Sequence, residues 1–163
     1  MQWLCEWRLH MKVTQTTDYE LIAQLNQPVQ QIHFELKPDY FKEYNYDDVK
    51  QFFKDIVHKD GFIFLLLEDG GNPLGFAMIE IREYPENPFR KAYRSVFVHQ
   101  ISIVETQRKK GYGTRLMEEI YNIAKKHGID VIELDYWVGN TVAEKFYKKH
   151  GFIKQREFVY KKI

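Results

Sequence analysis

The chain has 163 residues, a length typical of one domain and sufficient to bury a hydrophobic core. Lys plus Arg (24) nearly balances Asp plus Glu (23), so the overall charge does not favour binding to nucleic acid or to an anionic membrane. Cys5 is the only cysteine, which excludes a disulfide framework and a cysteine-based zinc site. Any site for an anionic ligand must therefore be local.

The sequence shows no sign of a membrane span or a signal peptide. No apolar run approaches the roughly 20 residues that cross a bilayer, and charged residues interrupt the first ten. With a single cysteine, these features predict a soluble cytoplasmic protein. Residues 1–10 precede the first clear element, so we interpret them as an N-terminal extension and residues 11–163 as one domain.

The first part of the chain predicts a strand followed by helices. Residues 11–15 form the strand pattern, and Asp18 is suited to cap a helix over residues 19–26. Pro28 fits the first turn of a second helix, which Pro38 ends.

The middle of the chain predicts a third helix and then a hairpin. The helix starts near Asn45 and carries an apolar face to Val57. Residues 62–67 are a continuous apolar run typical of a central strand, and a turn at residues 69–72 leads into an antiparallel strand over residues 74–83. Residues 84–91 contain two prolines and predict a loop.

The last part predicts alternating strands and helices. A strand from Val98 leads through a glycine turn into a helix that ends at His127. Residues 131–137 form the next strand, Asn140 caps a further helix, and residues 152–163 give a last strand or strands. The whole pattern, without repeats or linkers, predicts a single α+β domain.

The glycine turn is the strongest candidate for a binding site. The first N–H groups of a helix lack partners within the helix, and the helix dipole places partial positive charge there, so a phosphate is a natural ligand. Gly111 and Gly113 permit backbone angles that a side chain would forbid and a close approach to the main chain. Three positive side chains stand beside the turn: Arg108, Lys109 and Lys110.

Two well-known phosphate motifs, G-x-G-x-x-G and G-x-x-x-x-G-K-[ST], are absent from this turn. What stands here, Arg108-x-x-Gly111-x-Gly113, resembles the Q/R-x-x-G-x-G/A acyl-CoA pyrophosphate motif of the GNAT superfamily of N-acyltransferases. Taken alone, the pattern also fits an ordinary strand-to-helix turn with a solvated basic tip.

A second motif strengthens the resemblance. The segment from Asn140 to Phe152 resembles the GNAT signature N-x-x-A-x-x-F-Y-x-K-x-G-F, and it lies one strand after the glycine turn, as in that family. The resemblance covers residues 11–163. It implies a mixed, mostly antiparallel sheet flanked by helices, in which the strand before the glycine turn and the strand at Val131 run parallel and splay apart around acyl-CoA.

The resemblance also implies a set of residues that bind acetyl-CoA. Main-chain groups near the end of the central strand would pair with the pantetheine arm, and the turn would bind the pyrophosphate. The helix of the second motif would line the ligand, although the spacing of Ala143 and Phe146 equally fits the buried face of a helix. The implied cofactor-binding residues are Ile101, Ser102, Ile103, Arg108, Lys109, Lys110, Gly111, Tyr112, Gly113, Thr114, Asn140, Ala143 and Phe146.

Two catalytic residues are implied in the same way. Tyr147 matches the family's general-acid position, and a phenol with a reference pKa of about 10 is protonated at pH 7. A buried core tyrosine is the alternative interpretation. His99 matches a position that supplies a base, and a reference pKa of about 6.5 suits that role. We expect the side chain of His99 to share strand parity with Ile101 and Ile103.

Other groups are assigned lesser roles. Glu80, Glu133 and Asp135 are reserve candidates for the base, and a structural role for His99 stays open. The remaining histidines lack the short spacing of metal ligands, so we expect no metal.

The resemblance implies an N-acetyltransferase that moves an acetyl group from acetyl-CoA to a primary amine by direct attack in a ternary complex. The alternatives are a protein or peptide N-acetyltransferase and a non-catalytic acyl-CoA sensor. A small-molecule amine is the favoured acceptor, and we expect no nucleic acid and no membrane as partner, with a homodimer left open. The acceptor would contact the early helices and the loop before the central strand, including His33, Tyr40, Phe41 and residues 84–93.

Overall fold

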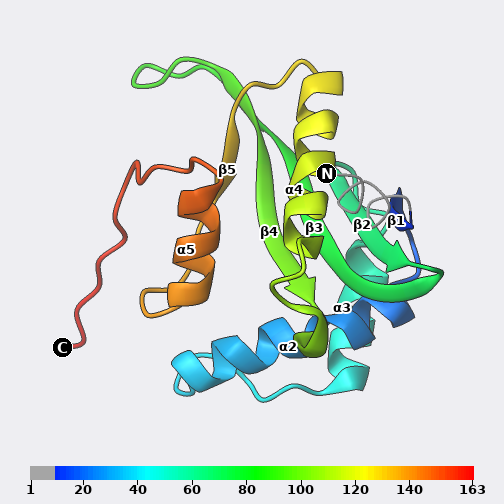
Figure 1. Ribbon diagram of the computed structural model, residues 1–163. Helices are drawn as coiled ribbons and strands as arrows, with labels where there is room; N and C mark the ends of the chain where they lie inside the picture. The colour runs from blue at the N-terminus through cyan, green and yellow to red at the C-terminus, as the bar shows by residue number, and fades with distance from the viewer. Residues whose placement is uncertain (1–9) are drawn as a thin grey trace.

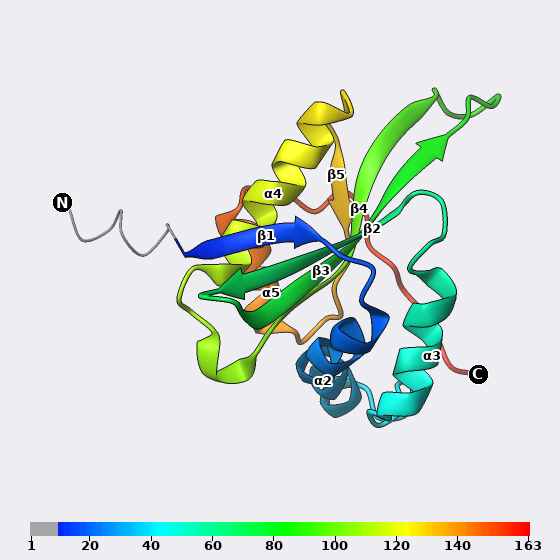
Figure 2. The ribbon, with the colours of Figure 1, turned by 90° about the vertical axis from the view of Figure 1, so that its right-hand side faces the viewer.

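The computed structural model describes residues 10–163, which form a five-stranded sheet with helices on both faces (Figure 1, Figure 2). The strands lie in chain order; the first four are antiparallel, and the last runs parallel to its neighbour. This confirms the predicted mixed, mostly antiparallel α+β fold. Residues 1–9 of the expected N-terminal extension lie outside the described residues. The elements are β1 (Met11–Gln15), α2 (Tyr19–Leu36), α3 (Tyr46–Ile56), β2 (Phe62–Asp69), β3 (Asn72–Tyr84), β4 (Tyr93–Ile103), the short helix η1 (Glu105–Gln107), α4 (Tyr112–Lys126), β5 (Ile132–Leu134) and α5 (Thr141–Lys149).

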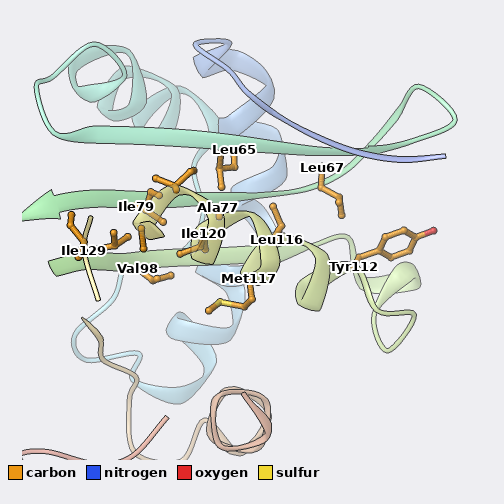
Figure 3. Packing of buried hydrophobic residues seen from close by; sticks show 13 residues of the cluster. Leu65, Leu67, Ala77, Ile79, Val98, Tyr112, Leu116, Met117, Ile120 and Ile129 are labelled. Atoms are coloured by element: carbon orange, nitrogen blue, oxygen red, sulfur yellow. The ribbon is translucent and has the colours of Figure 1, made fainter. Parts of the chain in front are cut away.

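Both faces of the sheet are covered, which explains the continuous apolar run in β2. Leu65 and Leu67 point to the face covered by α4, whereas Phe64 and Leu66 point to the face covered by α2 and α3. Figure 3 shows the first cluster, in which side chains of β2, β3 and β4 lie against α4. Residues of α4 in this cluster include Leu116, Met117 and Ile120. No helix within residues 10–163 is long and apolar enough to cross a membrane.

One continuous helix, α2, stands where the sequence predicted two helices, the second of them beginning near Pro28. The helix is continuous from Tyr19 to Leu36, with Pro28 inside it. Proline removes the hydrogen bond to the carbonyl four residues earlier, here that of Gln24. Gln24 is exposed, so water can replace that bond, while Ile22 and Leu25 on the opposite face are buried in the core and hold the helix in place.

The end of the chain departs further from the prediction. The expected strand over residues 131–137 is reduced to β5, three residues long, and the expected strand over residues 152–163 is absent. Within residues 10–163 no strand lies beside this segment, so its backbone has no ladder to join. Its apolar side chains are therefore exposed: Ile153 by 89%, Phe158 by 91% and Val159 by 82%. Figure 1 shows this C-terminal segment running away from α5.

Candidate active site

The central feature of the site is the separation of β4 from β5. The two strands pair in parallel over three residues only, after which β5 ends while β4 continues to Ile103. The paired residues are Val96 with Ile132, Phe97 with Glu133 and Val98 with Leu134. Beyond Val98, the edge of β4 that faces β5 has no strand beside it in the described chain (Figure 1). This is the splayed pair of parallel strands that the family resemblance implies.

Main-chain groups of β4 line this gap. The N–H of Val104 donates to the carbonyl of Leu74 at 2.9 Å, on the β3 side of the strand. Because main-chain groups alternate along a strand, the N–H and C=O groups of Ile101 and Ile103 then point away from β3 and into the gap. An extended ligand with amide groups can pair with them as an added strand would.

Ser102 is turned the other way. Its side chain is 3% exposed, and its hydroxyl donates to the carbonyl of Leu25 in α2 at 2.6 Å. By the same alternation its main-chain groups face β3. Neither part of Ser102 faces the gap, so in this region the contacts with a ligand fall to its two neighbours.

His99 lies at a β-bulge in β4. Ile79 of β3 pairs with Val98 and Met78 pairs with Gln100, which leaves His99 without a partner. The extra residue breaks the strand alternation, so His99 and Gln100 face the same side; Gln100 accepts a hydrogen bond from Asn26 of α2 at 2.8 Å.

The expectation that His99 shares parity with Ile101 and Ile103 is therefore wrong. Those two side chains pack into the cluster on the α4 face, whereas His99 lies on the opposite face among side chains of β2 and β3. A single inserted residue reverses the direction of every later side chain, which a period-two pattern cannot anticipate.

The side chain of His99 contacts a carboxylate. Its Nε2 lies 2.8 Å from Oε2 of Glu80, and the Nε–H of Arg82 donates to the same oxygen, also at 2.8 Å. The His99 ring stacks on Phe62, with centroids 5.4 Å apart, and Phe97 meets it edge-on at 4.9 Å. Burial raises the pKa of Glu80, but hydrogen bonds from Arg82 and His99 outweigh it and leave the pKa below its usual value. Glu80 is therefore ionised at neutral pH.

The glycine turn has the backbone of an anion-binding site. Lys109 has a φ of 64° and Gly111, the N-cap of α4, a φ of 89°. A Cβ on Gly111 would meet nothing within 4 Å, so its need for glycine comes from the backbone angle. Lys109 and Lys110 are exposed and Arg108 is half-buried. The turn thus presents the free N–H groups of the first turn of α4 together with three positive side chains.

Tyr112 and Thr114 follow the turn, and their side chains face the protein. Tyr112 is 6% exposed and donates from its hydroxyl to Oδ2 of Asp69 at 2.7 Å. That hydrogen bond, with burial, raises the pKa of Tyr112. The hydroxyl of Thr114 lies 3.3 Å from Nε2 of His150 in the cap of α5. Any contribution of Tyr112 to ligand binding therefore comes from its main chain.

Helix α5 packs directly on the start of α4. Its N-cap, Asn140, accepts a hydrogen bond from the N–H of Ala143 at 3.1 Å. The ring of Phe146 lies so close to Gly113 that a Cβ there would be 3.1 Å from it. Gly113 has no positive φ, so its backbone angles do not require a glycine. The absence of a side chain instead leaves room for the ring of Phe146. The two sequence motifs thus form one structural unit.

Tyr147 lies on the side of the sheet opposite to His99. It is half-buried, packs against the cluster under α4 and stacks on Tyr136, with ring centroids 6.1 Å apart. Burial, and to a lesser degree the charge of Asp135, raises the pKa of Tyr147. Its phenol therefore keeps its proton throughout the neutral range. No hydrogen bond joins Tyr147 to His99 within residues 10–163, so the two would reach a reacting group from different sides.

An aromatic cluster joins the loop after α2 to the loop after β5, and the sequence indicated only part of it. Phe41, from the loop after α2, stacks on His33 with centroids 4.8 Å apart and meets Trp137, from the loop after β5, at 5.2 Å. Tyr40 lies 4.9 Å from the same Trp137 ring. Burial lowers the pKa of His33, against an opposing effect of Asp135. Trp137 carried no sequence signal, because its partners lie about a hundred positions earlier in the chain.

Glu133, a reserve candidate for the base, is held by hydroxyl groups. Ser95 donates to its Oε2 at 2.7 Å, Tyr84 donates to the same oxygen at 3.4 Å, and Tyr93 donates to Oε1 at 3.3 Å. These contacts use several of its lone pairs, whereas Glu80 directly contacts His99. Among the candidate carboxylates, Glu80 is thus the one joined to the predicted base.

Comparisons with known proteins agree with this geometry. The profile of the Acetyltransferase (GNAT) family matches residues 28–152. The chain is 32% identical over 124 residues to the uncharacterized N-acetyltransferase MJ1207 of Methanocaldococcus jannaschii, covering 73% of this chain and 52% of that protein. It is 36% identical over 73 residues to the probable N-acetyltransferase san of Drosophila melanogaster, covering 43% and 40%. The chain thus spans about half the length of the curated relatives it matches.

Solved structures share the fold. A tetramutant of the BH1408 protein from Bacillus halodurans superposes with a TM-score of 0.87 at 23% identity, covering 93% of this chain and 99% of that one. The aminoglycoside N-acetyltransferase AAC(6')-Iy, solved in complex with CoA, gives a TM-score of 0.68 at 20% identity, covering 94% and 95%. The sheet with splayed parallel strands and a glycine turn is the GNAT architecture. This chain belongs to the Acetyltransferase (GNAT) family.

Proposed function

We propose that this protein is an N-acetyltransferase that moves an acetyl group from acetyl-CoA to a primary amine by direct attack in a ternary complex. The observation that carries the proposal is the gap between β4 and β5, which leads to the left-handed turn at the N-terminus of α4. A pyrophosphate suits the turn, and an amide-bearing arm suits the gap. That the structurally similar AAC(6')-Iy was solved with CoA supports the same choice of ligand.

The residues around the gap have distinct roles in this proposal. Arg108, Lys109 and Lys110 with the first N–H groups of α4 bind the diphosphate, and the main chain of Ile101 and Ile103 pairs with the pantetheine amides. His99 accepts a proton from the amine, whose nitrogen then bonds to the carbonyl carbon of the thioester. Tyr147 donates a proton to the sulfur as the C–S bond breaks, and the proton that the acylated nitrogen then loses returns to Tyr147 through solvent.

The aromatic cluster favours a small acceptor over a protein surface. Phe41 and Trp137 join the loop after α2 to the loop after β5, so a group of rings stands beside the end of β5, one of the two strands that border the gap. A site with such rings beside it suits an amine on a compact molecule, whereas a peptide or protein amine would suit an open groove. The pairing of His99 with ionised Glu80 favours catalysis over a sensor that binds acyl-CoA without turnover.

Calorimetric titration with acetyl-CoA, with dephospho-CoA in parallel, tests the ligand first, and thiol release over a panel of amines then tests turnover. The triple variant Arg108→Ala, Lys109→Ala, Lys110→Ala should bind acetyl-CoA at least tenfold more weakly, because it loses the charges at the turn. The variant Lys125→Ala, Lys126→Ala at the other end of α4 is the matched control and should bind as wild type. Absence of binding up to millimolar acetyl-CoA would contradict the proposal.

A further inference from the structure

We infer that Glu80 and Arg82 are positioning residues for His99: Arg82 holds the carboxylate of Glu80, and Glu80 holds the imidazole with Nε2 protonated, so that Nδ1 receives the proton of the acceptor amine. For its catalytic meaning the inference rests on the proposed function. The hydrogen-bonded chain itself can be tested without turnover.

The first support is that His99 and Arg82 contact the same carboxylate oxygen of Glu80. Oε2 of Glu80 lies 2.8 Å from both Nε2 of His99 and Nε of Arg82. An ionised carboxylate only accepts hydrogen bonds, so the His99 nitrogen that faces it is the one that carries the proton. The lowered pKa of Glu80 agrees with this state. Nδ1 is then the nitrogen with a free lone pair, and no described residue forms a hydrogen bond with it.

The second support is that all three side chains are confined. The guanidinium carbon of Arg82 lies 3.6 Å from the centroid of the Phe97 ring, which fixes Arg82 over the sheet. The same Phe97 ring meets His99 edge-on, and Phe62 stacks on the other side of the imidazole. His99 and Glu80 have 23% and 24% of their side chains exposed, so the pair is partly shielded from water yet reachable.

The third support is the bulge. Without an extra residue in β4, strand alternation would place the side chain of His99 on the same face as those of Ile101 and Ile103. The bulge instead places His99 and Gln100 on one face, so that His99 reaches Glu80 while Ile101 and Ile103 keep their main chain toward the gap. Bulges that redirect a side chain are common beside active sites.

Other titratable groups lie near these three residues as well. Tyr84 of β3 is a hydrogen-bond partner of Arg82, Glu133 of β5 pairs in register with Phe97, and Lys59 lies before β2 with its Nζ 5.5 Å from the Phe62 ring. When the amine gives its proton to Nδ1, His99 becomes positive. Unlike these groups, Glu80 is in direct hydrogen-bond contact with the ring, so it stabilises this cation, and the proton later passes to solvent.

Nitrogen-15 NMR of the histidine rings tests the positioning in the full-length protein. Wild type should show a downfield, slowly exchanging Nε2–H resonance, assigned to His99 by its absence in His99→Gln. Glu80→Leu should lose this resonance because leucine cannot accept the bond, whereas Glu80→Gln, with an amide oxygen, should retain it. The matched control is Glu83→Gln, an exposed carboxylate of the same strand, which should keep the signal. A resonance unchanged in a folded Glu80→Leu protein would overturn the inference.

The pH profile of kcat/KM tests the catalytic use. Removing the charge of Glu80 takes away the group that stabilises the cation formed on His99 as the amine gives up its proton, so in Glu80→Gln kcat/KM should fall by roughly tenfold across the pH profile. Arg82→Gln should lower kcat more than it raises KM. A Glu80→Gln profile that coincides with wild type overturns the inference even if acetyl transfer is established. Absence of turnover in wild type would refute the proposed function instead, and NMR would still decide whether Glu80 positions His99.

Discussion

The ring of Phe146 occupies the space that a side chain on Gly113 would need. A Cβ built on Gly113 would lie 3.1 Å from one ring atom of Phe146 and 3.2 Å from the next. The glycine turn and the second motif are far apart in the sequence, yet this contact makes each necessary for the shape of the other. Gly113 therefore serves packing between α4 and α5 as well as the site.

This contact predicts a specific destabilisation. Gly113→Ala should lower the free energy of unfolding by up to about 2 kcal/mol, because overpacking of the new methyl group against Phe146, about 1–3 kcal/mol, exceeds the gain of about 1 kcal/mol that alanine brings over glycine in a helix. Adding Phe146→Leu should recover part of the loss, since leucine leaves room. Urea denaturation of the two single variants and the double variant gives the coupling energy. Asn122→Ala, at an exposed position of α4, is the control and should change stability little. Strictly additive effects would contradict the contact.

Gly111 should respond differently from Gly113. Its φ of 89° is unfavourable for a residue with a side chain, but a Cβ there meets nothing within 4 Å. Gly111→Ala should therefore cost about 1–2 kcal/mol of stability through the backbone, and Gly111→Asn less, because asparagine tolerates a left-handed conformation better. Denaturation curves check this order. If alanine and asparagine lowered the free energy of unfolding equally, the backbone explanation would be contradicted.

Replacing Tyr147 should separate catalysis from binding. Tyr147→Phe removes only the hydroxyl, so kcat should fall by roughly 10²-fold or more, while the dissociation constant for acetyl-CoA stays within about twofold. Steady-state kinetics and calorimetry measure the two quantities. Tyr136→Phe, which alters the ring stacked on Tyr147, is the matched control and should keep most of the activity. Full activity in Tyr147→Phe would remove this residue from the mechanism.

The ionisation of Tyr147 should also affect the stability of the protein at alkaline pH. Burial raises the pKa of Tyr147 in the folded protein, so above pH 10 the unfolded chain loses this proton first. The unfolded state then binds fewer protons, and stability falls as pH rises. Between pH 9 and 11 the free energy of unfolding should decline less steeply in Tyr147→Phe than in wild type. Parallel curves would show that Tyr147 ionises as easily in the folded protein as in the unfolded chain.

The stabilising contribution of Glu80 should be lost at acid pH, whereas that of Tyr147 is lost at alkaline pH. Its pKa in the folded protein is lowered, so its stabilising contribution is present above the unfolded value of about 4.3 and is lost as pH falls through the folded value. Glu80→Gln should melt below wild type near pH 6, and the difference should shrink below pH 4. Glu83→Gln, from a carboxylate with 74% exposure, should differ little from wild type at either pH. A difference that does not narrow as the pH falls would contradict the prediction.

Local sequence signals predicted the elements that depend on local chemistry. Asp18 and Asn140 each cap the helix that they were expected to cap, and Asn45 caps the helix expected to start near it, because a side chain that bonds its own following N–H groups acts within three residues. The left-handed Gly111 belongs to the same class. The antiparallel pairing of β2 with β3 followed from the short hairpin at residues 69–72, and the parallel pairing of β4 with β5 followed from the family resemblance.

Features that depend on distant partners were not predictable. The bulge at His99 is defined by the pairing of β4 with β3, and the continuity of α2 through Pro28 by packing against the sheet. The contact of Phe41 with Trp137 likewise joins remote segments. Residues 152–163 have the composition of a strand, but a strand also needs a neighbour, and the described chain supplies none.

The three-residue ladder between β4 and β5 makes the two sides of the molecule unequal in their resistance to opening. Amide hydrogens of β2 and β3, held between neighbours, should exchange with deuterated water last, and those of β5 far sooner. A ligand that pairs with the free edge of β4 and also contacts α5 would connect β5 and α5, which open easily, to the more stable strands β2 to β4. Slower deuterium uptake in β5 and α5 on adding acetyl-CoA would then report occupancy before any acceptor amine is known.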